Sequence, residues 1–175
     1  MLIFDLGGGT FDVSVLAMEE GIFEVKATGG DTRLGGEDFD QSVGQFLLKQ
    51  FQKSNPGADI TDRAKRRLLA AAEKAKCTLS VTTSAEIEVE SFADGVDFQA
   101  TLSRAKFESL NAKEFERCMD TVRAVLKDAG VDKTQIDDVV LVGGSTRADP
   151  PAHSASRPPR SLSLARRARS VCAAG

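Results

Sequence analysis

Apolar and polar positions along the first 31 residues follow the two-residue period of β-strands. Residues 2–4 form a short apolar run, and residues 11–15 alternate apolar and polar side chains. Three consecutive glycines at positions 7–9 stand between them, so we expect two strands joined by a tight turn. The apolar side chains within residues 22–25 predict a third strand, which we expect to end in a loop at residues 29–31.

The next two segments show the helical period. Apolar side chains at positions 39, 43, 46, 47 and 51 predict an amphipathic helix over about residues 38–53. The sequence Asn-Pro-Gly at residues 55–57 would end that helix. A second helix is predicted from about Thr61 to Ser80, with Thr61 or Asp62 as its N-cap.

Alternation returns over residues 86–102, where the dipeptide Asp94-Gly95 separates two alternating runs. This pattern predicts a β-hairpin, because Asp-Gly is a preferred two-residue turn. Apolar positions over residues 107–126 then mark helical segments that we expect to end near Gly130. A last apolar run over residues 139–142, directly after Asp138, predicts a buried strand that leads into a glycine loop.

Together these elements predict an α/β fold with a mixed sheet, helices and a separate helix-and-hairpin subdomain. Residues 148–175 differ in character, because four of the five prolines lie there and no apolar period persists. We expect this segment, rich in Pro, Ser, Ala and Arg, to be a disordered tail.

Charge and composition exclude some classes of function. The last 25 residues hold five arginines and no acidic side chain, so the first 150 carry 18 basic and 26 acidic residues, a net charge of −8. An acidic body of this kind argues against nucleic-acid binding.

The apolar runs are too short to span a membrane, and we expect neither a signal peptide nor a membrane partner. Cys77, Cys118 and Cys172 form no metal-ligand pattern with His153, which predicts reduced thiols in a cytosol-like compartment.

The triple glycine is the centre of the first candidate site. Gly7, Gly8 and Gly9 permit close approach to the backbone, and successive N–H groups can form an anion site. Thr10 adds a hydroxyl group, and Asp5 is placed to orient hydrated Mg²⁺. No helix is predicted after the loop, so it is neither a Walker A motif nor a Rossmann fingerprint. A tight hairpin with acidic flanks is the alternative, and the glycines alone favour it.

A second candidate site lies on the second predicted helix. The spacings of Glu73, Lys76 and Ser80 place an acceptor, a cation and a hydroxyl group on one stripe. Such a stripe can hydrogen-bond the sugar and base of a nucleotide. The alternative, which the stripe alone favours, is a solvated face with a Glu73–Lys76 ion pair worth about a few tenths of a kcal/mol.

The third candidate site is the sequence Gly143-Gly144-Ser145-Thr146-Arg147, directly after the last predicted strand. Glycines at the carboxyl end of a strand are where α/β proteins place ligands. The planar guanidinium of Arg147 can stack on a nucleotide base. A strand-to-helix turn with a surface arginine is the alternative.

Four segments in order resemble one family, the seventy-kilodalton heat-shock chaperones of the DnaK type. Residues 4–14 (FDLGGGTFDVS) resemble its second phosphate motif, and residues 30–40 (GDTRLGGEDFD) resemble the block that follows. Residues 72–76 (AEKAK) and 78–80 (TLS) are similar to its adenosine-contacting helix, and residues 140–147 (VLVGGSTR) to its adenosine loop. The match covers about residues 2–147.

The resemblance implies an actin-like, ribonuclease H-like ATPase fold, with residues 1–147 as the second lobe of a nucleotide-binding domain. It implies ATP or ADP with Mg²⁺ as cofactors, the phosphates at Gly7 to Thr10, and Asp5 beside the metal through water. Asp5 and Thr10 would assist catalysis. The adenosine would be framed by Glu73, Lys76, Ser80, Gly143, Gly144, Ser145 and Arg147. Nucleotide-exchange factors and co-chaperones are the implied partners, and the subdomain between Glu37 and Phe115 resembles the part that exchange factors grip.

The chain also departs from the family pattern. The family's first lobe and catalytic lysine would precede Met1, so we expect the chain to be inactive in ATP hydrolysis by itself. Any targeting segment would precede Met1 too, so an organellar location stays open beside the cytoplasm. Cys77 stands where many cytosolic members carry an arginine that faces the base. Two other functions remain: a non-enzymatic module that binds exchange factors or co-chaperones, and a sugar or acetate kinase of the same superfamily, against which residues 34–40 argue.

Overall fold

The computed structural model describes residues 1–147. The chain forms two compact units, which we call unit 1 and unit 2. Unit 1 comprises Met1–Gly36 and the chain from Glu114 onward, and unit 2 comprises Glu37–Lys113. The predicted disordered tail over residues 148–175 lies outside the described residues.

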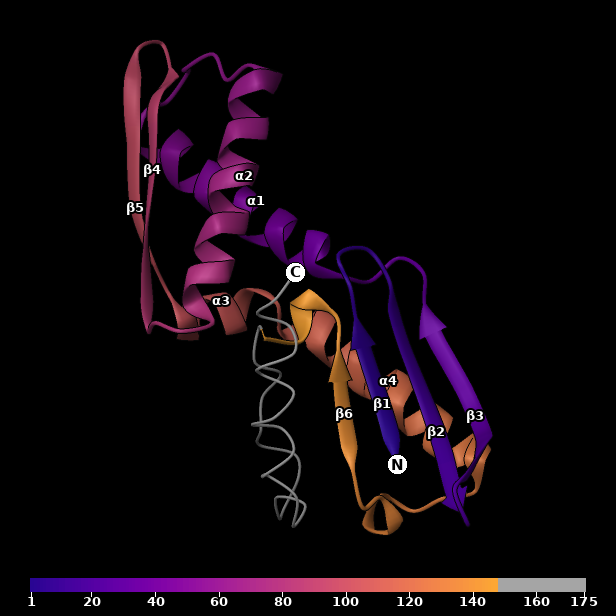
Figure 1. Cartoon of the computed structure of the whole chain (residues 1–175). Coiled ribbons are helices and arrows are strands. Elements are labelled where there is room, and N and C mark those ends of the chain that lie inside the picture. The colour runs from indigo at the N-terminus through magenta and orange to yellow at the C-terminus, as the bar shows by residue number, and fades with distance from the viewer. Residues whose placement is uncertain (148–175) are drawn as a thin grey trace. The chain divides into compact units, whose positions relative to one another are not determined.

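Unit 1 is built on a four-stranded sheet, with the strand order β3-β2-β1-β6 (Figure 1). Its strands are β1 (Leu2–Leu6), β2 (Phe11–Glu19), β3 (Ile22–Asp31) and β6 (Val139–Val142). The β1–β2 and β2–β3 pairs are antiparallel, whereas β1 and β6 run parallel. The prediction of an α/β fold with a mixed sheet is therefore confirmed.

One face of this sheet forms the core of unit 1. Side chains alternate between the two faces of β1 and β2, so the apolar ones gather on a single face. Helix α4 (Ala112–Ala129) buries Phe115, Cys118, Val122 and Val125, which recur at helical spacing. A Cβ atom on Gly29 of β3 would lie 2.7 Å from Val125 Cγ2, so α4 packs closely on the sheet. The apolar residues of the buried sheet face are at most 6% exposed: Leu2, Phe4, Leu6, Phe11, Val13 and Val15.

Two sequence predictions for unit 1 are wrong. Residues 29–31 do not form a loop but continue β3 to Asp31. Glycines suit this part of the strand, because Cβ atoms on Gly29 and Gly30 would collide with Val125 and with Asp12. The last strand, β6, is not buried: its four residues are 37–41% exposed. It is an edge strand among the described residues, paired on one side only with β1.

Unit 2 combines helices α1 (Gly36–Ser54) and α2 (Asp62–Leu79) with a hairpin of strands β4 (Ser84–Ala93) and β5 (Val96–Ser103), followed by α3 (Arg104–Leu110). The predicted helix-and-hairpin pattern is present. Phe51, Phe92 and Phe98 meet in its core, with ring centroids 4.8–5.8 Å apart.

Local capping and turn signals in the sequence set the element boundaries. The Thr61 hydroxyl accepts a hydrogen bond from the Ala64 N–H, which caps α2 as predicted. Asp94 and Gly95 both have positive φ, at 51° and 75°, as a tight hairpin turn requires. Helix α4 ends at Ala129, and Gly130 follows with a φ of 65°. Within residues 1–147, no helix is long and apolar enough to cross a membrane.

Candidate functional site

The triple glycine lies in the turn between β1 and β2. The Gly7 N–H donates to the Thr10 carbonyl at 2.9 Å, which closes the turn. Gly8, Gly9 and Thr10 are exposed, so their backbone is open to a ligand. The predicted tight hairpin is therefore present, and it has the open glycine backbone that an anion site needs.

A second turn packs against this glycine turn from the end of β3. The Gly36 N–H donates to the Gly7 carbonyl at 3.0 Å. A Cβ atom on Gly35 would lie only 2.5 Å from the Gly9 nitrogen and would also collide with Gly8. Only glycine fits at position 35 without a shift of the backbone, so the two turns form one closely packed structure.

The structure brings the glycine turn together with the segment that follows β6. Gly143 has a φ of 87°, and a Cβ atom there would collide with the Leu6 carbonyl and lie 2.8 Å from Asp5 Oδ1. The segment then forms a short 3-10 helix, η2 (Gly144–Arg147), in which the Thr146 hydroxyl donates to the Gly143 carbonyl at 2.8 Å. Two of the three predicted sites therefore meet at the carboxyl ends of the parallel strands β1 and β6.

The residues of η2 differ in their exposure to solvent. Gly144 is exposed, whereas Ser145 is buried at 8% exposure. Arg147 is the last residue of η2, and its side chain lies outside the described part of the structure. A base-stacking role for Arg147 thus stays a prediction.

Two carboxylates face the same side of the sheet next to the glycine turn. Asp5 and Asp12 are directly paired across β1 and β2, on the face away from α4. Residues 1–147 contain no group of three or more His, Cys, Asp or Glu side chains that could bind a metal ion. Hydrated Mg²⁺ needs only one or two carboxylates in addition to phosphate oxygens, so this pair fits such an ion. The sequence reasoning named Asp5 for this role and missed Asp12, although antiparallel pairing across a short turn places the two opposite each other.

The second predicted site lies on α2 in unit 2. Glu73 is exposed, and Ser80 is half-buried as the residue that caps the carboxyl end of the helix. Lys76 is only 12% exposed at its side chain, and its Nζ atom donates to Asp40 Oδ2 at 2.7 Å. Lys76 thus belongs to a buried ion pair, which the sequence reasoning did not predict.

The partner of Lys76 is a buried carboxylate on α1. Burial raises the pKa of Asp40, although the hydrogen bond from Lys76 and its charge act in the opposite direction. The second oxygen of the carboxylate, Oδ1, is also buried and has no hydrogen-bond partner. A sequence signal for this residue existed, because Asp40 lies three residues before Val43 and seven before Leu47, on the apolar face of the predicted helix.

The two cysteines among the described residues differ in environment. Cys77 is exposed on α2, whereas Cys118 is buried on α4. Burial raises the pKa of the Cys118 thiol to about 11. Both are free cysteines in the structure, and Cys172 lies outside the described residues.

Comparison with known proteins gives a consistent result. The sequence model of the family described as Hsp70 protein matches residues 1–152. A ribosome-associated molecular chaperone of Saccharomyces cerevisiae is 54% identical over 149 residues, which are 84% of this chain and 24% of that protein. Heat shock cognate 70 kDa protein 3 of Dictyostelium discoideum is 51% identical over 149 residues, with the same coverage.

The chain thus spans about a quarter of the length of the curated relatives that it matches. The family match includes both glycine segments of unit 1, the α2 stripe and the whole of unit 2. On these matches, and with a mixed α/β sheet that fits them, the chain belongs to the Hsp70 family.

Proposed function

We propose that this chain forms one side of the ATP- or ADP-binding site of a heat-shock chaperone. The observation that carries the proposal is the meeting of two glycine segments at the carboxyl ends of β1 and β6. Ligands of open α/β sheets bind at such strand ends. On this proposal residues 1–147 correspond to the second lobe of an actin-like nucleotide-binding domain, and unit 2 to its helix-and-hairpin subdomain.

Each part of the site has a distinct chemical task in this proposal. The exposed backbone from Gly7 to Thr10 would bind phosphate oxygens. Asp5 and Asp12 would hold the water shell of Mg²⁺, which when bound neutralises phosphate charge. The candidates for adenosine contacts in each unit are separate sets: in unit 2 Glu73, Ser80 and the ion-paired Lys76, and in unit 1 Gly143, Gly144, Ser145 and Arg147.

We further propose that this chain does not hydrolyse ATP by itself. Phosphoryl transfer depends on several groups that act on one phosphate at once, in a site from which water is excluded. The backbone of Gly8, Gly9 and Thr10 is exposed, so charges there interact through water and lose most of their strength. ATP-dependent chaperone activity, co-chaperone binding and a cytoplasmic location are proposed for the longer protein of which such a lobe would be part.

Nucleotide titration tests the binding proposal. Calorimetry of the 175-residue chain with ADP should show weak binding that strengthens with Mg²⁺. Asp5→Asn should lower the magnesium-dependent affinity roughly tenfold, since contacts to charged groups are worth about 1.5–3 kcal/mol. Asp128→Asn, an exposed carboxylate on α4 in the same unit, is the matched control and should leave binding unchanged. Equal affinity with and without Mg²⁺ in all three proteins would contradict the assignment of Asp5.

A second candidate function is supported by the compactness of unit 2, residues 37–113. A unit with its own aromatic core can act as a binding module for exchange factors or co-chaperones without nucleotide. Capture of such a factor by this chain, unchanged by Asp5→Asn and by ADP, would favour this function over nucleotide binding.

A further inference from the structure

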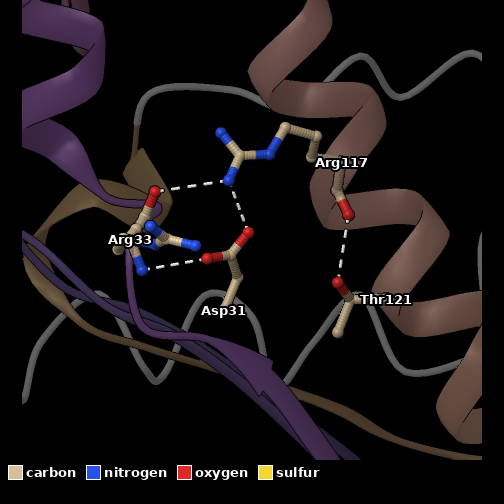
Figure 2. A network of polar contacts seen from close by, with 4 residues as sticks. All are labelled: Asp31, Arg33, Arg117 and Thr121. Carbon is tan, nitrogen blue, oxygen red and sulfur yellow. Dashed lines mark hydrogen bonds and ion pairs between the residues drawn. The ribbon is translucent and has the colours of Figure 1, made fainter.

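A polar network joins the end of β3 to helix α4 in unit 1 (Figure 2). Asp31 accepts hydrogen bonds at both carboxylate oxygens: Oδ1 from the Arg33 N–H at 2.9 Å and Oδ2 from Arg117 Nη2. The same Arg117 nitrogen lies 3.3 Å from the Arg33 carbonyl and donates to it. One guanidinium on α4 therefore holds both the side chain and the backbone of the turn that leaves β3.

The turn held in this way is the one that packs against the glycine turn. Leu34, next in the chain, is fully buried. Gly35 then lies against Gly8 and Gly9, and the Gly36 N–H donates to the Gly7 carbonyl. Only Leu34 therefore separates Arg33, whose carbonyl Arg117 holds, from Gly35, which contacts the glycine turn.

Close packing makes this connection stiff. Gly35 has no room for even one additional carbon atom against the backbone of Gly8 and Gly9. A displacement of the turn at Arg33 therefore has to be taken up by the glycine turn or by the Gly36–Gly7 hydrogen bond. The guanidinium of Arg117 contacts Asp31 and Arg33, whereas the Thr121 hydroxyl donates to the Arg117 backbone carbonyl within α4. The influence of the Arg117 side chain on the glycine turn therefore passes through the β3 turn.

We propose that Arg117 is a positioning residue for the phosphate-binding turn. It holds Asp31 and the Arg33 carbonyl on α4, and through Gly35 and Gly36 it fixes the backbone geometry of residues 7–9. The functional part of this inference rests on the proposed nucleotide binding, because it gives the glycine turn its ligand. The structural part, a connection from α4 to that turn, does not depend on any ligand.

The network is too exposed to act mainly as a stabiliser of the whole unit. The side chains of Asp31 and Arg117 are 29% and 47% exposed, and ion pairs of this kind contribute little to global stability. A purely structural role therefore predicts a small, evenly spread effect of substitution. A positioning role predicts an effect confined to the two turns.

Hydrogen exchange without nucleotide tests the connection. In the Arg117→Ala variant of the full chain, the amides of Gly7 and Gly36 should exchange about threefold faster, the range expected for the loss of one exposed ion pair. Amides of Ile3 and Ser14, which form a hydrogen-bonded pair in the ladder between β1 and β2, should keep their rates. Arg123→Ala is the matched control: it lies on the same helix with 54% exposure, and its ion pairs with Glu116 and Asp120 stay within α4.

A second variant keeps the test valid if Arg117→Ala folds poorly. Asp31→Asn retains an oxygen that can accept from the Arg33 N–H but removes the charge that faces Arg117. It should reproduce the exchange pattern of Arg117→Ala, and the double variant should add little to either. Arg117→Lys keeps the positive charge and should restore most of the original rates at Gly7 and Gly36.

Titration with magnesium-ADP then tests the functional part. Arg117→Ala should weaken binding about threefold, Arg117→Lys should restore most of it, and Arg123→Ala should leave it unchanged. If no variant and not even the original chain binds ADP while Gly7 and Gly36 respond as expected, the nucleotide proposal fails and the connection stands. If ADP binds and the exchange of Gly7 and Gly36 is the same in Arg117→Ala and Arg123→Ala, the positioning role of Arg117 is refuted.

Discussion

Within residues 1–147, a carboxylate–cation pair in each unit links distant parts of the chain, and these two pairs lie in opposite environments. In unit 1 Asp31 pairs with Arg117 at the surface, with side chains 29% and 47% exposed. In unit 2 Asp40 pairs with Lys76 in the interior, with side chains 8% and 12% exposed. The pKa values of the two carboxylates are shifted in opposite directions as a result.

The cause of this difference is solvation. The pKa of Asp31 is lowered, first by the hydrogen bond from the Arg33 N–H and then by the one from Arg117. The pKa of Asp40 is raised, because burial outweighs the favourable contact with Lys76. A similar ionic contact thus adds little to the stability of the fold at the surface. In the interior, loss of one partner strongly destabilises the fold, because the other charge is left buried and unpaired.

Removal of the buried cation should have the largest effect. Lys76→Met should destabilise unit 2 by about 3–5 kcal/mol at neutral pH, because it leaves the Asp40 charge buried without a partner. Urea unfolding followed by hydrogen exchange of α2 amides measures this loss. Lys74→Met, exposed on the same helix, is the control and should change stability by about 0.5 kcal/mol or less.

A double substitution sharpens the same prediction. Asp40→Leu combined with Lys76→Met should recover most of the lost stability, because a well-packed apolar pair often replaces a buried ion pair without loss. The deficit of Lys76→Met alone should also shrink as the pH falls through the raised pKa of Asp40, because the carboxylate then takes up a proton. A deficit that is independent of pH and unchanged in the double variant would show that Lys76 acts through packing alone.

The two described cysteines extend the comparison from carboxylates to thiols. Cys118 is buried with a pKa of about 11, so about one in a thousand of its thiols is ionised at pH 8. With Cys172 replaced by Ser, iodoacetamide at pH 8 should label the exposed Cys77 at least about a hundred times faster than Cys118. Mass spectrometry of the labelled peptides measures both rates, and the denatured chain gives the reference rates. Equal rates in the folded protein would mean that α4 leaves the sheet frequently.

Local signals in the sequence predicted the elements of both units well, and tertiary features were predicted less well. Asp94-Gly95 and the Thr61 cap were found because their hydrogen bonds and φ angles depend on a few adjacent residues. The extension of β3 through Gly29 and Gly30 was missed, because the need for glycine there comes largely from Val125 on α4. The exposure of β6 was missed since an apolar run does not reveal whether a strand lies at the edge of a sheet.

In the candidate site, too, local motifs were predicted from the sequence and tertiary contacts were not. The glycine turn, Asp5 and Gly143 stand in contiguous motifs, and the structure brings these together. Whether they bind nucleotide stays a prediction. Arg117 gave no signal, because its partner Asp31 lies 86 positions away and nothing in the sequence links them.

Titration of the two carboxylates should show a smaller but well-defined difference. Observed by carbon NMR, the pKa of Asp31 should lie below the ordinary value of 3.8 and that of Asp40 above it. For Asp31 the stabilising contribution is complete above pH 3.8 and is lost as the pH falls through its lowered pKa. For Asp40 the sign is reversed: stability falls as the pH rises from 3.8 through its raised pKa, since the folded chain there binds more protons than the unfolded chain. The reverse order of the two midpoints would show that Lys76 outweighs burial at Asp40.

The surface pair should have the smallest effect on global stability. Arg117→Ala should lower the free energy of unfolding by about 1 kcal/mol or less, because water already screens a pair that is 29% and 47% exposed. About half a molar salt in the urea unfolding buffer should reduce even that difference, because the Debye length then falls to about 4 Å. The same salt should leave most of the Lys76→Met deficit in place, since a buried pair is screened much less. A loss above about 3 kcal/mol on Arg117→Ala that resists salt would show that the Asp31 network is a folding determinant of unit 1, and the contrast between the two pairs would not hold.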